Sequence, residues 1–122
     1  MNKFKYLLII FLFSLFINSG CAQNPENQIL GKWEDEYGRS TTEFFKDGTI
    51  ITIHKREEPI KGIGKYKFIG EKVIKVDYPP EVDQKFPLHG THIFEVKFPD
   101  KDKLALIVYG DNIKLYNYSK IK

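Results

Sequence analysis

FFKDGTII, residues 44–51, places a Lys-Asp-Gly turn between two apolar runs. Glycine in the turn permits a positive φ, and Asp-Gly between strand-forming residues is a strong hairpin signal. Residues 72–77 and 94–98 alternate apolar and charged side chains with a period of two. That alternation predicts strands with one buried face, and no window has the apolar spacing of an amphipathic helix. The sequence therefore predicts an all-β domain.

Short turns divide the rest of the chain into segments of similar length. Gly70-Glu71, Pro99–Asp102 and Gly110-Asp111 each separate two apolar segments. The spacing predicts eight strands, at residues 32–37, 41–46, 49–55, 62–69, 72–78, 92–98, 103–109 and 112–118. Consecutive strands joined by tight turns form a meander, and closing it into a small antiparallel up-and-down β-barrel removes its exposed edges.

The interior of an eight-stranded barrel is just wide enough to be filled by side chains or to hold one small ligand. The side chains predicted to point inwards are bulky, which favours a filled interior and leaves a hollow one as the alternative. They are Trp33, Phe44, Ile51, Ile53, Tyr66, Phe68, Ile74, Val76, Phe94, Val96, Phe98, Leu104, Leu106, Val108, Ile113 and Leu115. Gly62 and Gly64 are predicted to let their strand bend as the barrel closes.

LGKW, residues 30–33, resembles the Gly-x-Trp opening of lipocalin-type barrels, in which the tryptophan of the first strand closes the bottom. FFKDGT and the ending LYNYSK, residues 115–120, resemble strands of small bacterial lipocalin-like lipoproteins. The resemblance implies a lipocalin-like β-barrel domain over residues 30–122 that binds a small apolar ligand, whose identity stays open. The candidate contacts for such a ligand are Trp33, Tyr66, Phe68 and Phe94.

The first 20 residues have the three parts of a secretory signal. Lys3 and Lys5 precede an uncharged run of twelve residues, 6–17, in which only Ser14 is neither apolar nor aromatic. A bilayer span needs about 20 apolar residues, so a cleaved signal is favoured over an uncleaved membrane anchor. Ser19-Gly20-Cys21 then resembles the lipobox of bacterial lipoproteins, although Asn18 replaces the usual aliphatic residue.

That second resemblance implies a lipoprotein signal peptide at residues 1–20 and a lipidated Cys21. Several acyl chains hold a protein on a membrane where one chain does so only weakly. Cys21 is the only cysteine, so no disulfide is expected. Residues 21–29 are predicted to form a polar tether. The expected location is the bacterial cell envelope, at the outer membrane or the outer face of the plasma membrane.

The composition of the mature chain excludes a large electrostatic surface for nucleic acid. Without Lys3 and Lys5 the chain has 17 basic and 16 acidic residues, a formal charge of +1. A nucleic-acid surface needs a clustered excess of lysine and arginine. The sequence also has no Gly-x-Ser-x-Gly elbow or phosphate-binding loop, so we expect neither enzymatic activity nor a cofactor.

The histidines offer one weak metal hypothesis. His89 and His92 have a spacing that could bring two imidazoles to one metal ion, with Glu81 and Asp83 as oxygen ligands. The simpler interpretation, a pair of solvated loop histidines, is favoured, and no metal is predicted. His54 is expected to end a strand in solvent.

Residues 78–91 form the longest break between predicted strands, and long loops are often functional. Its apolar side chains, Tyr78, Phe86 and Leu88, could cover an open barrel end as a lid or contact an envelope protein. The lid is the favoured interpretation. A cavity lined by apolar groups would favour a ligand-binding module, whereas a packed interior with an exposed aromatic loop would favour a protein-interaction or inhibitor module.

Overall fold

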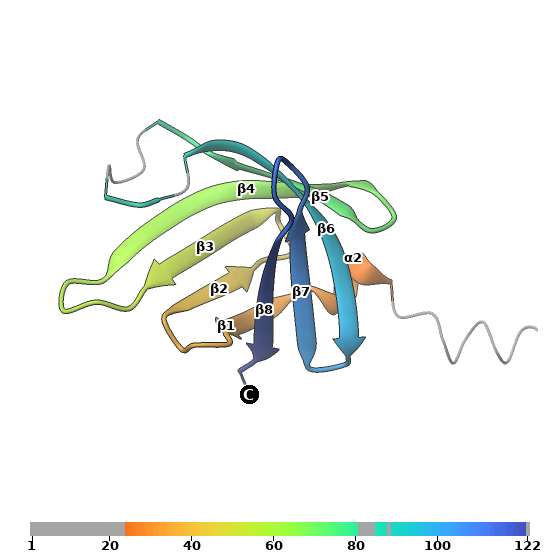
Figure 1. Ribbon diagram of the computed structural model, residues 1–122, viewed down its shortest axis with the longest axis horizontal. Helices are drawn as coiled ribbons and strands as arrows, with labels where there is room; N and C mark the ends of the chain where they lie inside the picture. Colours follow the sequence, from red (N-terminus) through yellow and green to blue (C-terminus); the bar gives the residue numbers. More distant parts are fainter. Residues whose placement is uncertain (1–23, 81–84, 88, 122) are drawn as a thin grey trace, which may run out of the picture.

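The computed structural model describes residues 24–80, 85–87 and 89–121. Eight strands follow one another around a single closed antiparallel barrel, which confirms the predicted all-β meander (Figure 1). Their bounds are β1 Gly31–Asp35, β2 Ser40–Phe44, β3 Thr49–His54, β4 Ile60–Gly70, β5 Val73–Tyr78, β6 Gly90–Asp100, β7 Lys103–Val108 and β8 Lys114–Lys120. The predictions for the signal peptide and Cys21 lie outside the described residues.

The β2–β3 turn has the geometry that its sequence predicts. Gly48 adopts a φ of 91°, and its N–H donates to the carbonyl of Phe45 at 3.1 Å. The backbone N–H of Thr49 donates to Asp47 Oδ1 at 2.9 Å. That hydrogen bond is the main reason why the pKa of Asp47 lies below its usual value. The Lys-Asp-Gly segment is therefore a tight hairpin turn, as expected.

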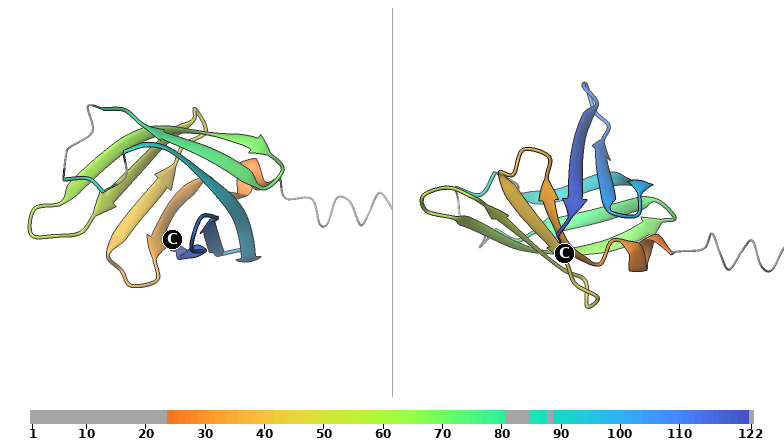
Figure 2. Two further views of the ribbon diagram at one scale, coloured as in Figure 1. Left: turned by 45° about the horizontal axis from the view of Figure 1, so that its top comes forward. Right: turned by 90° about the horizontal axis from the view of Figure 1, so that it is seen from below.

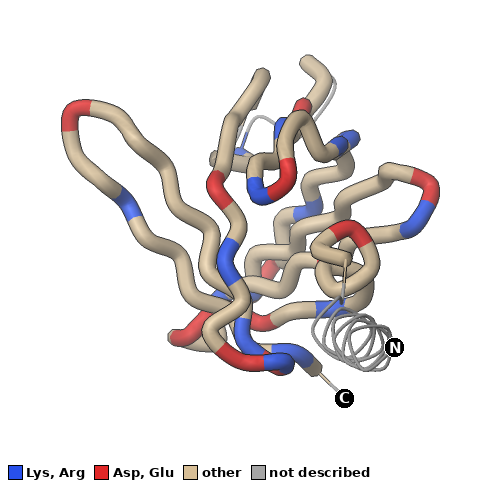
Figure 3. The backbone as a smooth tube through the Cα atoms, turned by 90° about the vertical axis from the view of Figure 1, so that its right-hand side faces the viewer, with Lys and Arg blue, Asp and Glu red and all other residues tan. Residues whose placement is uncertain are grey.

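The barrel closes through a short seam between β1 and β8. Trp33 lies opposite Lys120, and Asp35 lies opposite Tyr118. The N–H of Glu36 extends the seam by donating to the carbonyl of Asn117 at 2.9 Å. β8 pairs with β1 only at its last three residues, so the rest of the β7–β8 hairpin extends away from the barrel (Figures 2 and 3).

Trp33 closes one end of the barrel. Its side chain is fully buried, and its Nε1–H donates to the carbonyl of Ile29 at 2.8 Å. Ile29 is also fully buried and follows α2, Pro25–Gln28, a single helical turn capped by Asn24. The predicted tether is thus helical in part, because the Asn-Pro start favours a helix N-terminus. Lys120 places Nζ 5.2 Å from the Trp33 ring and donates to the carbonyl of Leu30 at 3.0 Å.

The interior is filled by side chains, and most of the predicted inward residues lie in it. Those that are buried are Trp33, Phe44, Ile74, Val76, Phe94, Val96, Leu104 and Leu106, with Tyr66, Phe68, Phe98 and Val108 partly buried against them. Two strands differ from the prediction. On β3 the buried residues are Ile50 and Thr52 instead of Ile51 and Ile53, because Phe44 pairs with Ile50 and Thr42 with Thr52.

The second difference is on β8. Ile113 and Leu115 are 69% and 55% exposed, because they belong to the hairpin that extends beyond the barrel. Tyr118 is the β8 side chain that packs against the core instead. The apolar residues of this strand were therefore assigned to the wrong face.

We predict that Trp33→Ala lowers the free energy of unfolding by about 3 to 5 kcal/mol, because it removes a large buried side chain and leaves a cavity. Denaturant unfolding followed by circular dichroism measures the change. Tyr37→Ala is the matched control, because that aromatic side chain is 68% exposed and its loss should have little effect. In the native protein Trp33 should emit at short wavelength, and water-like emission would contradict the buried position.

Candidate functional site at the barrel mouth

Small side chains line the inner face of three neighbouring strands, from Thr42, which pairs with Trp33, towards the end of the barrel where the β5–β6 loop lies. Thr42 of β2 pairs with Thr52 of β3, and Thr52 pairs with Gly62 of β4. All three positions are buried, as is Gly64 on the same strand. Side chains from elsewhere must fill the space that these residues leave, since protein interiors are closely packed.

The rings of Phe86 and Tyr78 fill that space. A Cβ atom on Gly62 would lie 2.3 Å from the Phe86 ring, and one on Gly64 would lie 2.9 Å from the Tyr78 ring. These glycines therefore allow two aromatic rings to approach the strand closely. The sequence had predicted a different role for them, namely to let the strand bend. Ring packing over strand glycines is a known way to stabilise them.

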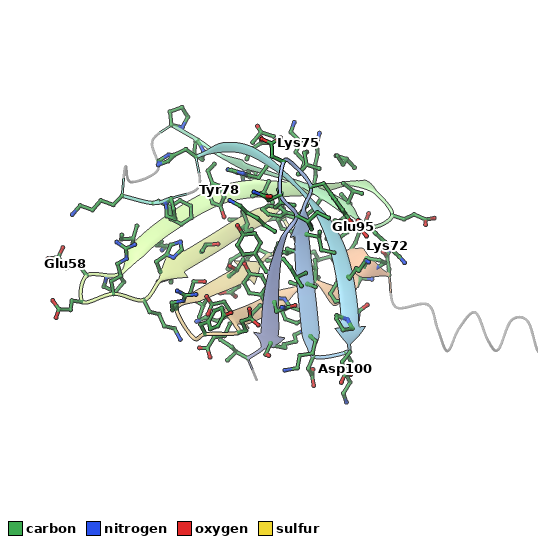
Figure 4. All side chains as sticks on the ribbon, in the orientation of Figure 1. Glu58, Lys72, Lys75, Tyr78, Glu95 and Asp100 are labelled. Carbon is green, nitrogen blue, oxygen red and sulfur yellow. The ribbon has the colours of Figure 1, made fainter. Side chains whose placement is uncertain are left out.

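Phe86 is a lid over the barrel mouth. Its side chain is fully buried, with its ring centre 4.9 Å from that of Tyr78 and 5.3 Å from that of His54. Residues 81–84 and Leu88, the third apolar residue of the predicted lid, lie outside the described residues. Tyr78 belongs to the end of β5 and points into the barrel (Figure 4). Phe86 is carried by the loop, whereas its neighbours are carried by strands.

A row of hydroxyl groups runs under this lid. The hydroxyls of Thr42 and Thr52 lie 3.1 Å apart, and that of Thr52 lies 3.2 Å from the Tyr78 hydroxyl. Tyr118 of β8 lies near this pair, and the Thr42 hydroxyl slightly lowers the pKa of the Tyr118 side chain. Burial raises the pKa of both tyrosines above the usual value, so both stay protonated and can donate. The hydrogen-bonded row therefore runs from β2 through β3 to β5.

His54 adds an unsatisfied polar atom to the mouth. Its Nε2 is buried and has no hydrogen-bond partner among the residues that the structure describes. Burial, followed by the nearby Arg56, lowers the pKa of the imidazole, while Asp35 raises it to a lesser degree. The expected solvated histidine is thus a partly buried one that packs on Phe86 and favours its neutral form.

The four predicted ligand contacts lie in the core, and their described ring contacts are not with Phe86. Trp33 packs against Phe98, with ring centres 6.3 Å apart. Tyr66 meets Phe44 edge-on at 5.1 Å and donates its hydroxyl to the carbonyl of Phe45 at 2.6 Å. Of the other two predicted ligand contacts, Phe68 packs against the core, and the Phe94 ring stacks on His92 with ring centres 6.2 Å apart.

His89 and His92 make a local contact with each other. His92 Nε2 lies 2.9 Å from the backbone carbonyl oxygen of His89. The described residues contain no group of three or more His, Cys, Asp or Glu side chains that could hold a metal ion. Glu81 and Asp83, the proposed oxygen ligands, lie outside those residues.

Two open surface grooves lie at turns of the chain. One, of about 760 Å³, is formed by α2 and the β4–β5 turn. The other, of about 440 Å³, is formed by the β3–β4 loop and Lys85, next to Phe86.

Within the described part of the chain, no helix is long and apolar enough to cross a membrane.

Sequence reasoning missed the polar residues of the mouth, namely Thr42, Thr52, His54 and Tyr118. A signal for the first was present, because Thr42 precedes Phe44 by two positions and must share its face. The inward positions of Thr52 and His54 can be assigned once the register of β3 against β2 is known.

No protein-family model matches the chain, and no curated protein matches it.

We predict that Gly62→Ala displaces Phe86, because the new methyl group would meet the ring at 2.3 Å. Overpacking of this kind costs about 1 to 3 kcal/mol of unfolding free energy. Gly70→Ala on the same strand is the control, since its Cβ would lie at an ordinary 3.7 Å from Val73. Thermal unfolding compares the two, and an equal effect of both substitutions would contradict the packing of Phe86 on Gly62.

Proposed function

We propose that the protein is a membrane-anchored binding protein of the bacterial cell envelope, whose lipocalin-like barrel takes a small, flat, apolar ligand at its mouth. The observation that carries the proposal is the slot over Gly62 between Tyr78 and His54. A loop-borne aromatic ring fills this slot. Because Phe86 is not part of a strand, its ring can leave the slot without breaking a backbone pair of the barrel. A ligand ring of similar size then takes its place.

The polar groups around the slot suggest how such a ligand is oriented. Small-molecule sites are mostly apolar and hold a few polar groups at fixed positions. Here His54 Nε2 has no partner among the described residues, and the Thr52 and Tyr78 hydroxyls lie at the base of the mouth. A planar compound with one polar group fits this combination, because that group can satisfy the imidazole nitrogen.

We predict that Phe86→Ala binds the neutral fluorescent probe N-phenyl-1-naphthylamine at least about tenfold more tightly than the wild type, a gain of roughly 1.4 kcal/mol. The substitution removes the ring that competes for the slot. Fluorescence titration measures the affinity, after circular dichroism has established that the variant is folded. Adding Gly62→Val to this variant should refill the slot and abolish the gain.

Equal probe binding by the wild type and the Phe86→Ala variant would contradict a ligand site at the mouth. The alternative function, a protein-interaction or inhibitor module, would then be preferred. One observation favours that alternative: Tyr109, Ile113 and Leu115 of the β7–β8 hairpin are 60%, 69% and 55% exposed. The Tyr109 hydroxyl, at the turn end of this hairpin, donates to Glu95 of β6 at 2.6 Å.

The anchor rests on the sequence alone, through the apolar run and the Ser19-Gly20-Cys21 motif. We predict that Cys21→Ser moves the protein from the membrane fraction to the soluble fraction, because the thiol that would carry the lipid is lost. Membrane fractionation with a high-salt wash, followed by immunoblotting, measures the change. If the variant stays in the washed membranes, Cys21 is not the anchor.

A further inference from the structure

The outer surface of β4, β5 and β6 combines lysine with exposed isoleucine. β4 alternates buried and exposed positions, so every second residue of the strand points away from the barrel. The outward-facing set, here called the Lys–Ile face, consists of the exposed Lys61, Ile63, Lys65, Lys67 and Ile69 of β4 and Ile93 of β6, with the half-buried Lys75 of β5. Its three isoleucines, Ile63, Ile69 and Ile93, are 47%, 51% and 45% exposed.

The sheet register makes these side chains neighbours. Lys67 lies opposite Lys75, and Lys75 lies opposite Ile93. Two acids interrupt the face. Asp77 lies opposite Lys65, 3.8 Å from Lys75 Nζ, and accepts a hydrogen bond from Thr91. Glu95 lies two residues from Ile93 on the same side of β6, 3.7 Å from Lys97 Nζ. Figure 4 shows Lys75 on the upper side of the sheet, directed away from the barrel. The face is therefore continuous, apolar in part and positive on balance.

Such a face is unfavourable in water alone. Two like charges directly opposite each other on neighbouring strands destabilise a sheet. Exposed isoleucine side chains also leave apolar surface in contact with water. Both costs are offset if the face lies against a surface that is negatively charged and has an apolar layer beneath the charges, and an anionic lipid bilayer has this chemistry.

The start of the described chain lies at one end of this face. Asn24, Pro25 and Glu26 line one groove together with residues 68–72 of the β4–β5 turn. Lys72, at this turn, is labelled beside α2 in Figure 4. Cys21 precedes Asn24 by three residues, a distance of at most ~11 Å in a fully extended chain. A lipid on Cys21 would therefore hold this end of the face close to the bilayer.

We propose that the Lys–Ile face lies flat on a bilayer that contains anionic lipids. The lysines contact headgroup charges, and Ile63, Ile69 and Ile93 reach the boundary with the acyl chains. This inference rests on the proposed anchor, which supplies the attachment, while the face fixes the orientation. In this orientation β4–β6 face the membrane, and the seam between β1 and β8 faces the solvent.

The test uses the mature chain with Cys21→Ser, so that no lipid anchor contributes to binding. Co-sedimentation with phosphatidylcholine vesicles, with and without phosphatidylglycerol, measures its affinity. We expect binding only to the vesicles with phosphatidylglycerol, and weaker binding as salt increases. Replacing Lys61, Lys65 and Lys67 by glutamine should weaken it roughly fivefold per lysine, or about a hundredfold in total.

The matched control replaces three exposed lysines on the opposite side of the barrel by glutamine: Lys101, Lys103 and Lys114. This control should bind like the parent chain, and an equal loss in both triple variants would overturn the inference. Absence of binding to phosphatidylglycerol would also overturn it, even where the Cys21→Ser fractionation upholds the anchor. A solution dimer that only the first triple variant dissociates would assign the face to a second copy and overturn the membrane contact.

Discussion

The interior of a closed eight-stranded barrel has a nearly fixed width, and its side chains must fill that width without overlap. In this chain the volume of the inward side chains differs from one wall of the barrel to another. Thr42, Thr52 and Gly62 contribute little volume on one wall, so the Tyr78 ring must reach across from another and Phe86 must come down from the loop. The position of the lid, the hydroxyl row beneath it and the environment of His54 all follow from this division of volume.

The two ends of the barrel are consequently built in different ways. At one end Trp33 is fixed by a hydrogen bond to Ile29, by the turn of α2 and by Lys120 over its ring. At the other end the closing ring, Phe86, is attached to a loop rather than to a strand. A strand-borne ring moves only with its sheet, whereas a loop-borne ring has a lower cost of displacement. This asymmetry is why the ligand site is proposed at the mouth and not at the floor.

The sequence was sufficient to predict the barrel architecture, but it did not predict for every strand which side chains point into the barrel. Turn residues and period-two alternation located all eight strands, with ends that differ by a few positions. β3 has isoleucine on both faces, so hydrophobicity alone favoured Ile51 and Ile53, and only the pairing with β2 places Thr52 inside. Leu115 was assigned to the core because it is the most apolar residue of β8, whereas the pairing of Leu104 with Tyr118 and of Leu106 with Tyr116 places the other face of the strand inside. The candidate site was predicted only as a lid, since its polar residues come together through register.

The seam between β1 and β8 has a consequence for how the chain reaches this structure. Lys120 and Leu30, which meet there through a hydrogen bond, are 90 residues apart in sequence. Contacts of such high sequence separation raise the contact order, and chains dominated by them fold in milliseconds to seconds instead of microseconds. Because the first and last strands must meet, the barrel cannot close until almost the whole chain is present. Until then β1 has an unpaired edge, which makes the open meander the species most exposed to pairing with other chains.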